Sequence, residues 1–181
     1  MTMTALSDRL AAAATAAFGA HVSVVGLERL SGGACQDNYC VDLHLAPGAH
    51  DGTIALAGDR RFVLRSDAVR SLPGSVARRV ESGVITAARL HDVPTPAVRL
   101  AAEDIVRPGA SAILLDWCEG TAIGRRVVAS PSLAHARSQL PAALADALAR
   151  IHRVRPEHAP TLLAGSAFVL DPTAAALDAL D

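Results

Sequence analysis

The chain has 181 residues, enough for one domain of ordinary size or for one lobe and part of another. Its formal net charge of -1 provides no basic field for nucleic acid or acidic lipid, so we expect no nucleic-acid partner and no membrane partner. Only 3% of the residues are aromatic, which favours closely packed helices over aromatic binding platforms. The three cysteines include no Cys-x-x-Cys pair, so neither a disulfide framework nor a zinc site is predicted, and a reduced, cytoplasmic protein is expected.

The first predicted element is an amphipathic helix near the N-terminus. Leu6, Leu10, Ala14 and Phe18 recur every four residues, which is the spacing of one helical face. The alanine-rich run at 10–20 also has the length of a signal-peptide core. The weak hydrophobicity of alanine and an acidic residue beside the preceding arginine favour the helix. No apolar run approaches the ~20 residues of a membrane span.

Three strands are predicted next, at residues 21–30, about 38–45, and 60–65. Apolar and polar residues alternate in them, as is typical of strands with one buried face. The first two strands should form a hairpin with Gly32 and Gly33 near its tip, because glycine tolerates backbone angles that other residues resist. The sequence APGAHDG after the second strand predicts a loop.

A second helix and two further strands complete the predicted sheet. Ser75 is a candidate N-cap for a helix that runs to about residue 91, with Val76, Val80 and Val84 along one side. Prolines follow the helix, and strands are predicted at 97–101 and 112–117. The sequence therefore predicts an α+β fold with five antiparallel strands and one helix between the third and fourth.

Helical patterns dominate after residue 120. Ser130 and Pro131 predict the start of a helix in which apolar residues recur up to Ile151, and Asp146 and Arg150 have the spacing of an i,i+4 ion pair. A last helix is predicted near the C-terminus. It has no glycine or basic residue to satisfy its final carbonyls, which favours a chain cut inside a helix over a natural terminus.

Four segments together carry a resemblance to a known family: LSGGACQDNYCVDL, FVLRSD, the predicted helix with Glu81, and AILLDWCEG. They resemble the aminoglycoside phosphotransferase and choline-kinase-like superfamily, and within it the phosphotransferase proteins related to kinase domains of some acyl-CoA dehydrogenases. The resemblance covers about residues 25–155. It implies a protein-kinase-like N-lobe that spans residues 1–118 and includes the hinge. Residues 119–181 would be the first helices of an incomplete α-helical C-lobe.

The first of these segments resembles the loop that covers the ATP phosphates in such kinases. Backbone N–H groups at a small-residue turn can bind anionic oxygens. A plain hairpin turn is the alternative, because Gly-Gly is common in turns. By resemblance, the covering loop consists of Ser31, Gly32, Gly33, Ala34 and Cys35.

The second and third segments would supply a phosphate-binding pair. The resemblance places Arg65 where most kinases have lysine, and arginine can grip phosphate with two N–H groups. Glu81 would then be the helix carboxylate that orients Arg65. The alternative is a solvated glutamate flanked by Arg78 and Arg79.

The fourth segment resembles the hinge between the two lobes, where backbone groups hold adenine. Leu115 would guard the pocket, Asp116 would offer a carbonyl, and Cys118, after Trp117, would offer both N–H and carbonyl. Leu-Asp-Trp also looks like the family's magnesium-binding segment. We reject that alternative, because the metal segment should follow a catalytic loop, and Glu119 with the helices after it suits the hinge.

The family transfers the γ-phosphate of ATP to a hydroxyl of a small molecule, with Mg²⁺. The family's catalytic Asp, its Asn and the metal-binding Asp have no counterpart here, and none of the seven histidines precedes Gly-Asp. The resemblance therefore implies a nucleotide as ligand, no catalytic or metal residue, and a chain that is inactive alone.

The alternative is a non-catalytic nucleotide-binding or protein-interaction module. In that case a missing C-lobe or a second copy of the chain would cover an exposed apolar face. The sequence leaves the hydroxyl substrate open.

Overall fold

The computed structural model describes residues 2–30, 36–52, 54–69 and 76–155. Its helices are α1 (Met3–Phe18), α2 (Arg78–Leu90), α3 (Gly124–Ala129) and α4 (Ala134–Ile151), with a 3-10 turn at Pro131–Leu133. Its strands are β1 (Val22–Arg29), β2 (Gln36–Leu45), β3 (His50–Asp51), β4 (Ile54–Ala55), β5 (Gly58–Asp67), β6 (Val98–Glu103) and β7 (Ser111–Asp116).

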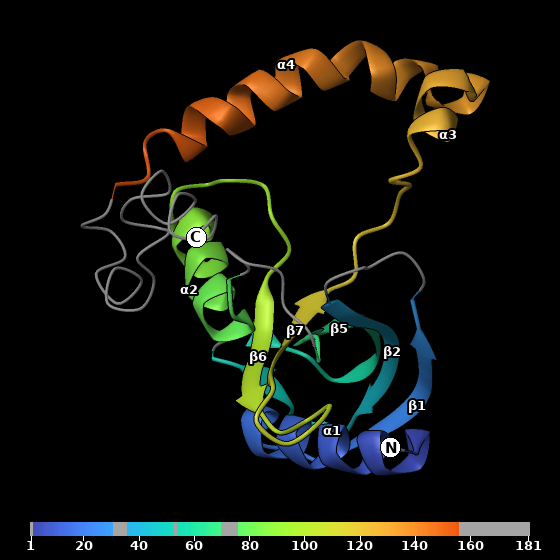
Figure 1. The fold of residues 1–181 in the computed structure, drawn as a ribbon, viewed down its shortest axis with the longest axis vertical. Coiled ribbons are helices and arrows are strands. Elements are labelled where there is room, and N and C mark those ends of the chain that lie inside the picture. Colours follow the sequence, from blue (N-terminus) through green and yellow to red (C-terminus); the bar gives the residue numbers. More distant parts are fainter. Residues whose placement is uncertain (1, 31–35, 53, 70–75, 156–181) are drawn as a thin grey trace, which may run out of the picture.

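Five of the strands form one antiparallel sheet in the order β1-β2-β5-β7-β6 (Figure 1). The predicted α+β fold with a five-stranded antiparallel sheet is therefore confirmed. β3 and β4 form a separate two-stranded ribbon, part of which falls where the sequence predicted only a loop.

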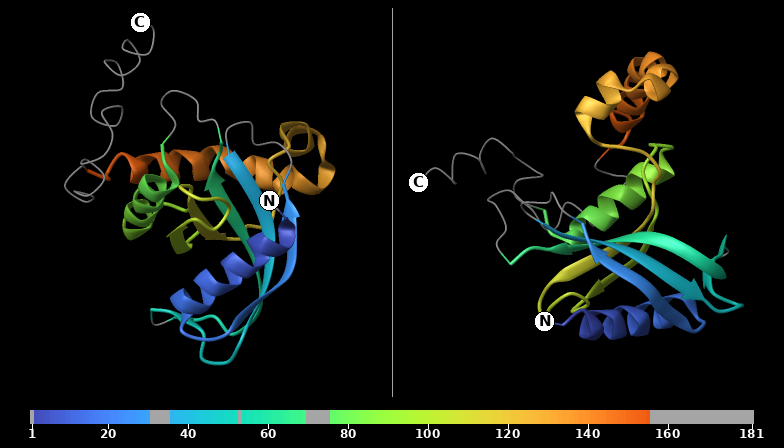
Figure 2. Two further views of the ribbon diagram at one scale, coloured as in Figure 1. Left: turned by 60° about the horizontal axis from the view of Figure 1, so that its bottom comes forward. Right: turned by 90° about the vertical axis from the view of Figure 1, so that its right-hand side faces the viewer.

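Helix α1 covers one face of the sheet (Figure 2). Leu6, Leu10, Ala14 and Phe18 are all buried, in a core that also contains Leu64 of β5. The Arg9 side chain reaches from α1 to the backbone carbonyls of residues 105 and 106, at 2.7 and 3.1 Å. The amphipathic helix predicted from the four-residue spacing is confirmed.

Helix α2 lies on the opposite face of the sheet (Figure 2). It begins at Arg78, not at Ser75, which lies outside the described residues. The Asp67 carboxylate, at the end of β5, accepts a 3.0 Å bond from the Arg78 backbone N–H, so a residue distant in sequence satisfies a free donor of the first turn. Val84 is 46% exposed, so the predicted apolar side of this helix is wrong at that position.

Helices α3 and α4 follow an extended segment and lie apart from the sheet (Figure 1). Pro131 begins a 3-10 turn, and α4 starts three residues later than predicted, at Ala134. The predicted i,i+4 ion pair between Asp146 and Arg150 is present at 2.8 Å. Neither helix has a buried residue. Among the described helices, none combines the length and hydropathy needed to cross a membrane.

Candidate functional site

The face of the sheet that carries α2 presents a row of side chains from β5. Successive side chains of a strand point to opposite faces. Phe62 and Leu64 are buried in the core, so Arg61, Val63 and Arg65 lie on the other face. The candidate site is built on this second face.

At one end of the row, Arg65 forms an ion pair with Glu81 of α2. Arg65 Nη1 lies 2.6 Å from Glu81 Oε1. The other carboxylate oxygen of Glu81 accepts from Arg78 Nη1, and the Arg78 side chain is only 5% exposed. The predicted pairing of Arg65 with Glu81 is confirmed, and Glu81 is not a merely solvated glutamate.

Gln36, the first residue of β2, holds the remaining side of the Arg65 guanidinium. Arg65 Nε and Nη2 both donate to Gln36 Oε1, at 2.8 and 2.5 Å. In the register of the two strands Gln36 pairs with Asp67, so it is a diagonal neighbour of Arg65. Sequence reasoning did not identify Gln36. It lies two residues before Asn38, the cross-strand partner of Arg65, and this position could have indicated it.

Asp67 connects this cluster to the neighbouring strand. One carboxylate oxygen accepts from the Arg78 backbone N–H and lies 3.3 Å from Arg78 Nε, and the other accepts from the Ser111 N–H at 3.2 Å. Arg107 donates to the Asp67 carbonyl and lies 3.2 Å from Asp37. These contacts hold the first turn of α2 against the sheet, and therefore fix the position of Glu81.

The predicted hinge begins at Leu115 and Asp116, the last two residues of β7, and continues into the two residues after the strand. Leu115 is buried beside Val63, its cross-strand partner. The Asp116 carboxylate accepts two bonds from Arg99, at 2.8 and 2.7 Å, and this bond raises the pKa of Arg99 above its ordinary value. The Asp116 side chain therefore joins the end of β7 to Arg99 of β6. Cys118 is exposed and makes no backbone–backbone hydrogen bond to the described residues.

A cleft of about 330 Å³ opens beside Trp117, at the other end of the row. The Arg61 guanidinium lies over the indole ring, 5.7 Å from the ring centroid. Asp42 holds Arg61 with two bonds of 2.7 and 3.1 Å. The residues that line the cleft are Gly26, Leu27, Glu28, Leu30, Cys40, Asp42, Arg61 and Trp117.

Gly26 provides the space in which Asp42 lies. A Cβ at position 26 would meet Asp42 Oδ2 at 3.0 Å, so a larger residue would press on the group that holds Arg61. Sequence reasoning missed Gly26, Cys40, Asp42 and Arg61. The period-2 pattern could have found Arg61, because it lies four residues before Arg65 on the same face.

Two pKa shifts occur at the cleft. The hydrogen bond from Arg61 holds the pKa of the Asp42 carboxyl below its usual value, so Asp42 is ionised at neutral pH. Burial raises the pKa of the Cys40 thiol, which keeps it protonated and makes it a poor nucleophile. The Cys40 thiol of the cleft is therefore not activated for nucleophilic catalysis.

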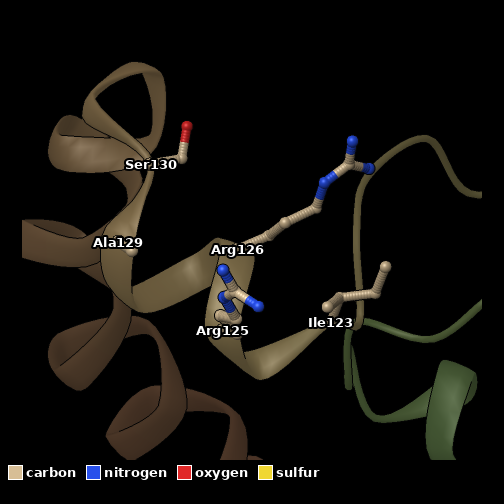
Figure 3. Close-up of a pocket in the computed structure, with 5 residues that line it drawn as sticks. All are labelled: Ile123, Arg125, Arg126, Ala129 and Ser130. Carbon is tan, nitrogen blue, oxygen red and sulfur yellow. The ribbon is translucent and has the colours of Figure 1, made fainter.

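A second cavity, of about 470 Å³, lies beside α3 and is lined by Ile123, Arg125, Arg126, Ala129 and Ser130 (Figure 3). Arg126 extends from the helix on the side on which Ile123 lies (Figure 3). Both arginines are exposed, and no acidic residue lines the cavity. Two guanidinium groups could attract an anionic group here.

The predicted covering loop, Ser31 to Cys35, lies outside the described residues. Within the described ranges, no three His, Cys, Asp or Glu side chains form a group that could hold a metal ion. Comparison of the chain with protein-family models and with curated proteins finds no match in either.

Proposed function

We propose that this chain is the nucleotide-binding part of an ATP-dependent small-molecule phosphotransferase, built as a kinase-like N-lobe at 1–118 with helices of a C-lobe after it. The base of the nucleotide lies in the cleft beside Trp117. Its phosphates extend along the sheet to Arg65. The observation that carries this proposal is the Arg65–Glu81 ion pair on the same sheet face as the Trp117 cleft.

The spacing along β5 supports this placement. Arg61 and Arg65 are four residues apart, and a strand rises about 3.3 Å per residue. Roughly 13 Å therefore separates Arg61, at the cleft, from Arg65, which would bind the phosphates. An extended nucleotide can bridge such a distance. Val63, which lies between these ends and is only partly buried, gives an apolar surface for the ribose.

Charge supports the direction in which the nucleotide lies. Arg65 is partly buried, with 31% of its side chain exposed, so its attraction for phosphate is less screened than that of a surface arginine. The cleft at the Trp117 end is lined by two carboxylates, Glu28 and Asp42, against one guanidinium, Arg61, and this excess of negative charge would repel phosphate. The triphosphate is therefore favoured at Arg65 and the base at Trp117.

The described residues offer no group of ligands for Mg²⁺, so the proposal assigns none of them to the metal. It likewise assigns no residue to the transfer step. Nucleotide binding is the part of the function to which this chain's own residues contribute.

The test is calorimetric titration of the chain with a non-hydrolysable ATP analogue in buffer that contains Mg²⁺. Saturable binding is expected for the wild type, with at least ten-fold weaker binding for Arg65→Met, because a charge-assisted bond to phosphate is lost. Arg60→Met is the matched control, since Arg60 is exposed on the same strand. Absence of binding by folded wild-type chain, or equal binding by Arg65→Met, would overturn the proposal.

A further inference from the structure

The Arg65 guanidinium has two acceptors of different character. Glu81 is a carboxylate, and it is held in turn by Arg78. Gln36 is neutral, and its single amide oxygen accepts from both Nε and Nη2 of Arg65. Nε–H and the adjacent Nη2–H form the side-on fork with which arginine takes phosphate bidentately.

Resting on the proposed function, we infer that Gln36 occupies the phosphate-binding fork of Arg65 in the ligand-free protein and is exchanged for a phosphate oxygen when nucleotide binds. Gln36 is then a residue that sets nucleotide affinity by competing with the ligand. Its amide keeps a partly buried guanidinium hydrogen-bonded until phosphate arrives.

Of the two acceptors, Gln36 is the one that gives way. The guanidinium is charged in both cases, but a phosphate oxygen adds an opposite charge that the neutral amide oxygen lacks, so phosphate replaces the amide favourably. Displacement of Glu81 would exchange one anion for another. A movement of Glu81 away from Arg65 would also disturb the bond of its other oxygen to Arg78, which is 5% exposed.

A different arrangement makes the opposite prediction. An arginine has five N–H groups, and Gln36 and Glu81 accept from three of those on Arg65. A phosphate that bound only the other two would leave Gln36 in place as a clamp. Removal of Gln36 would then loosen Arg65 and weaken binding.

The experiment is titration of wild type and Gln36→Met with three probes: the ATP analogue, inorganic triphosphate and adenosine. Methionine has a similar length but no amide acceptor. Gln36→Met is expected to bind the ATP analogue and triphosphate about five-fold more tightly, because the bonds from Arg65 to the amide oxygen no longer compete with phosphate. Adenosine affinity should not change. Gln139→Met, at the other glutamine of the chain, is the matched control because Gln139 is exposed on α4.

Two further variants separate competition from a merely structural role. Gln36→Glu places a carboxylate on the fork and should weaken triphosphate binding at least ten-fold. In an Arg65→Met background, Gln36→Met should give no gain, because the fork is absent.

The outcomes distinguish the inference from the proposed function. Equal or weaker binding of triphosphate by Gln36→Met, with normal binding by wild type, would overturn the inference alone. Absence of nucleotide binding by both proteins in folded form would overturn the proposed function and the inference with it.

Discussion

The sheet unit and the α3–α4 pair use similar apolar patterns with opposite results. In α1, apolar residues repeat every four positions and all are buried against the sheet. In α4, Leu140, Leu144, Leu148 and Ile151 repeat in the same manner, yet each is 41–59% exposed. The comparison teaches that an amphipathic pattern fixes which side of a helix is apolar, but not what lies against that side.

Helices α2 and α4 also differ in how they are attached to the sheet unit. Glu81, Arg78 and Asp67 join α2 to the sheet through partly buried ion pairs. Arg150 of α4 reaches the same unit with one 2.8 Å bond to the carbonyl of Asp92. We therefore expect substitutions in the sheet unit to cost far more stability than substitutions in α4.

Substitution of a buried leucine should show the largest contrast. Leu10→Ala in α1 is expected to lower the free energy of unfolding by about 2–5 kcal/mol, because it removes apolar contacts and leaves a cavity. Leu144→Ala in α4 should change it by less than about 0.5 kcal/mol, since Leu144 is exposed. Urea unfolding of both variants measures the difference, and equal losses would show that α4 has a packed apolar face.

Loss of the buried arginine should come next. Arg78→Met leaves Asp67 and Glu81 without their shared partner, at an expected cost of about 2–4 kcal/mol. Arg79→Met is the adjacent control, because Arg79 is exposed. Thermal unfolding compares the two proteins. A variant at position 78 as stable as its neighbour would contradict the structural role of this network.

A smaller effect is expected at Gly26. Gly26→Ala places a methyl group 3.0 Å from Asp42 Oδ2, so the carboxylate must move and its bonds to Arg61 weaken. The expected loss comes mainly from this close contact, because the bonds that weaken are exposed to solvent. In an Asp42→Ala background the 3.0 Å contact is absent and only the 3.3 Å contact with Cβ remains, so most of the loss should disappear, as a double-mutant cycle by chemical unfolding would show. A loss that persists there undiminished would place the cause in the β1 backbone.

The smallest effect is expected for the exposed ion pair of α4. Asp146→Asn removes the partner of Arg150 and should cost about 0.3–0.5 kcal/mol at low ionic strength. In 1 M salt the difference should vanish, because surface charges are screened. A loss that is independent of salt in chemical unfolding would mean that Asp146 acts through packing instead.

The strands of the sheet and the core face of α1 could be predicted from the sequence, because each depends on a short periodic pattern. The first residue of α2 was predicted less accurately than the strands. The first turn of α2 donates a hydrogen bond to the carboxylate of Asp67, which is distant in sequence, whereas the prediction looked for a local cap at Ser75. The exposure of Val84 likewise depends on how α2 lies on the sheet.

The candidate site was predictable at Arg65 and Glu81, because a family resemblance supplied their spacing. Gln36, Asp42 and Arg61 were missed, since their contacts join different strands and depend on the register between them. The sequence gives strand faces more readily than strand partners. Nucleotide binding, Mg²⁺, the hydroxyl substrate and the cytoplasmic location stay predictions.

The most direct test of the central claim uses Trp117, the single tryptophan of the chain, as an intrinsic probe of the cleft. We would titrate wild type and Arg65→Met with ATP and with adenosine and record indole fluorescence. The account predicts a saturable change with both ligands. For Arg65→Met, half-saturation by ATP should need at least ten-fold more ligand, while adenosine titrates both proteins equally. No fluorescence change in folded wild type, or identical ATP curves, would contradict a single site that joins Trp117 to Arg65.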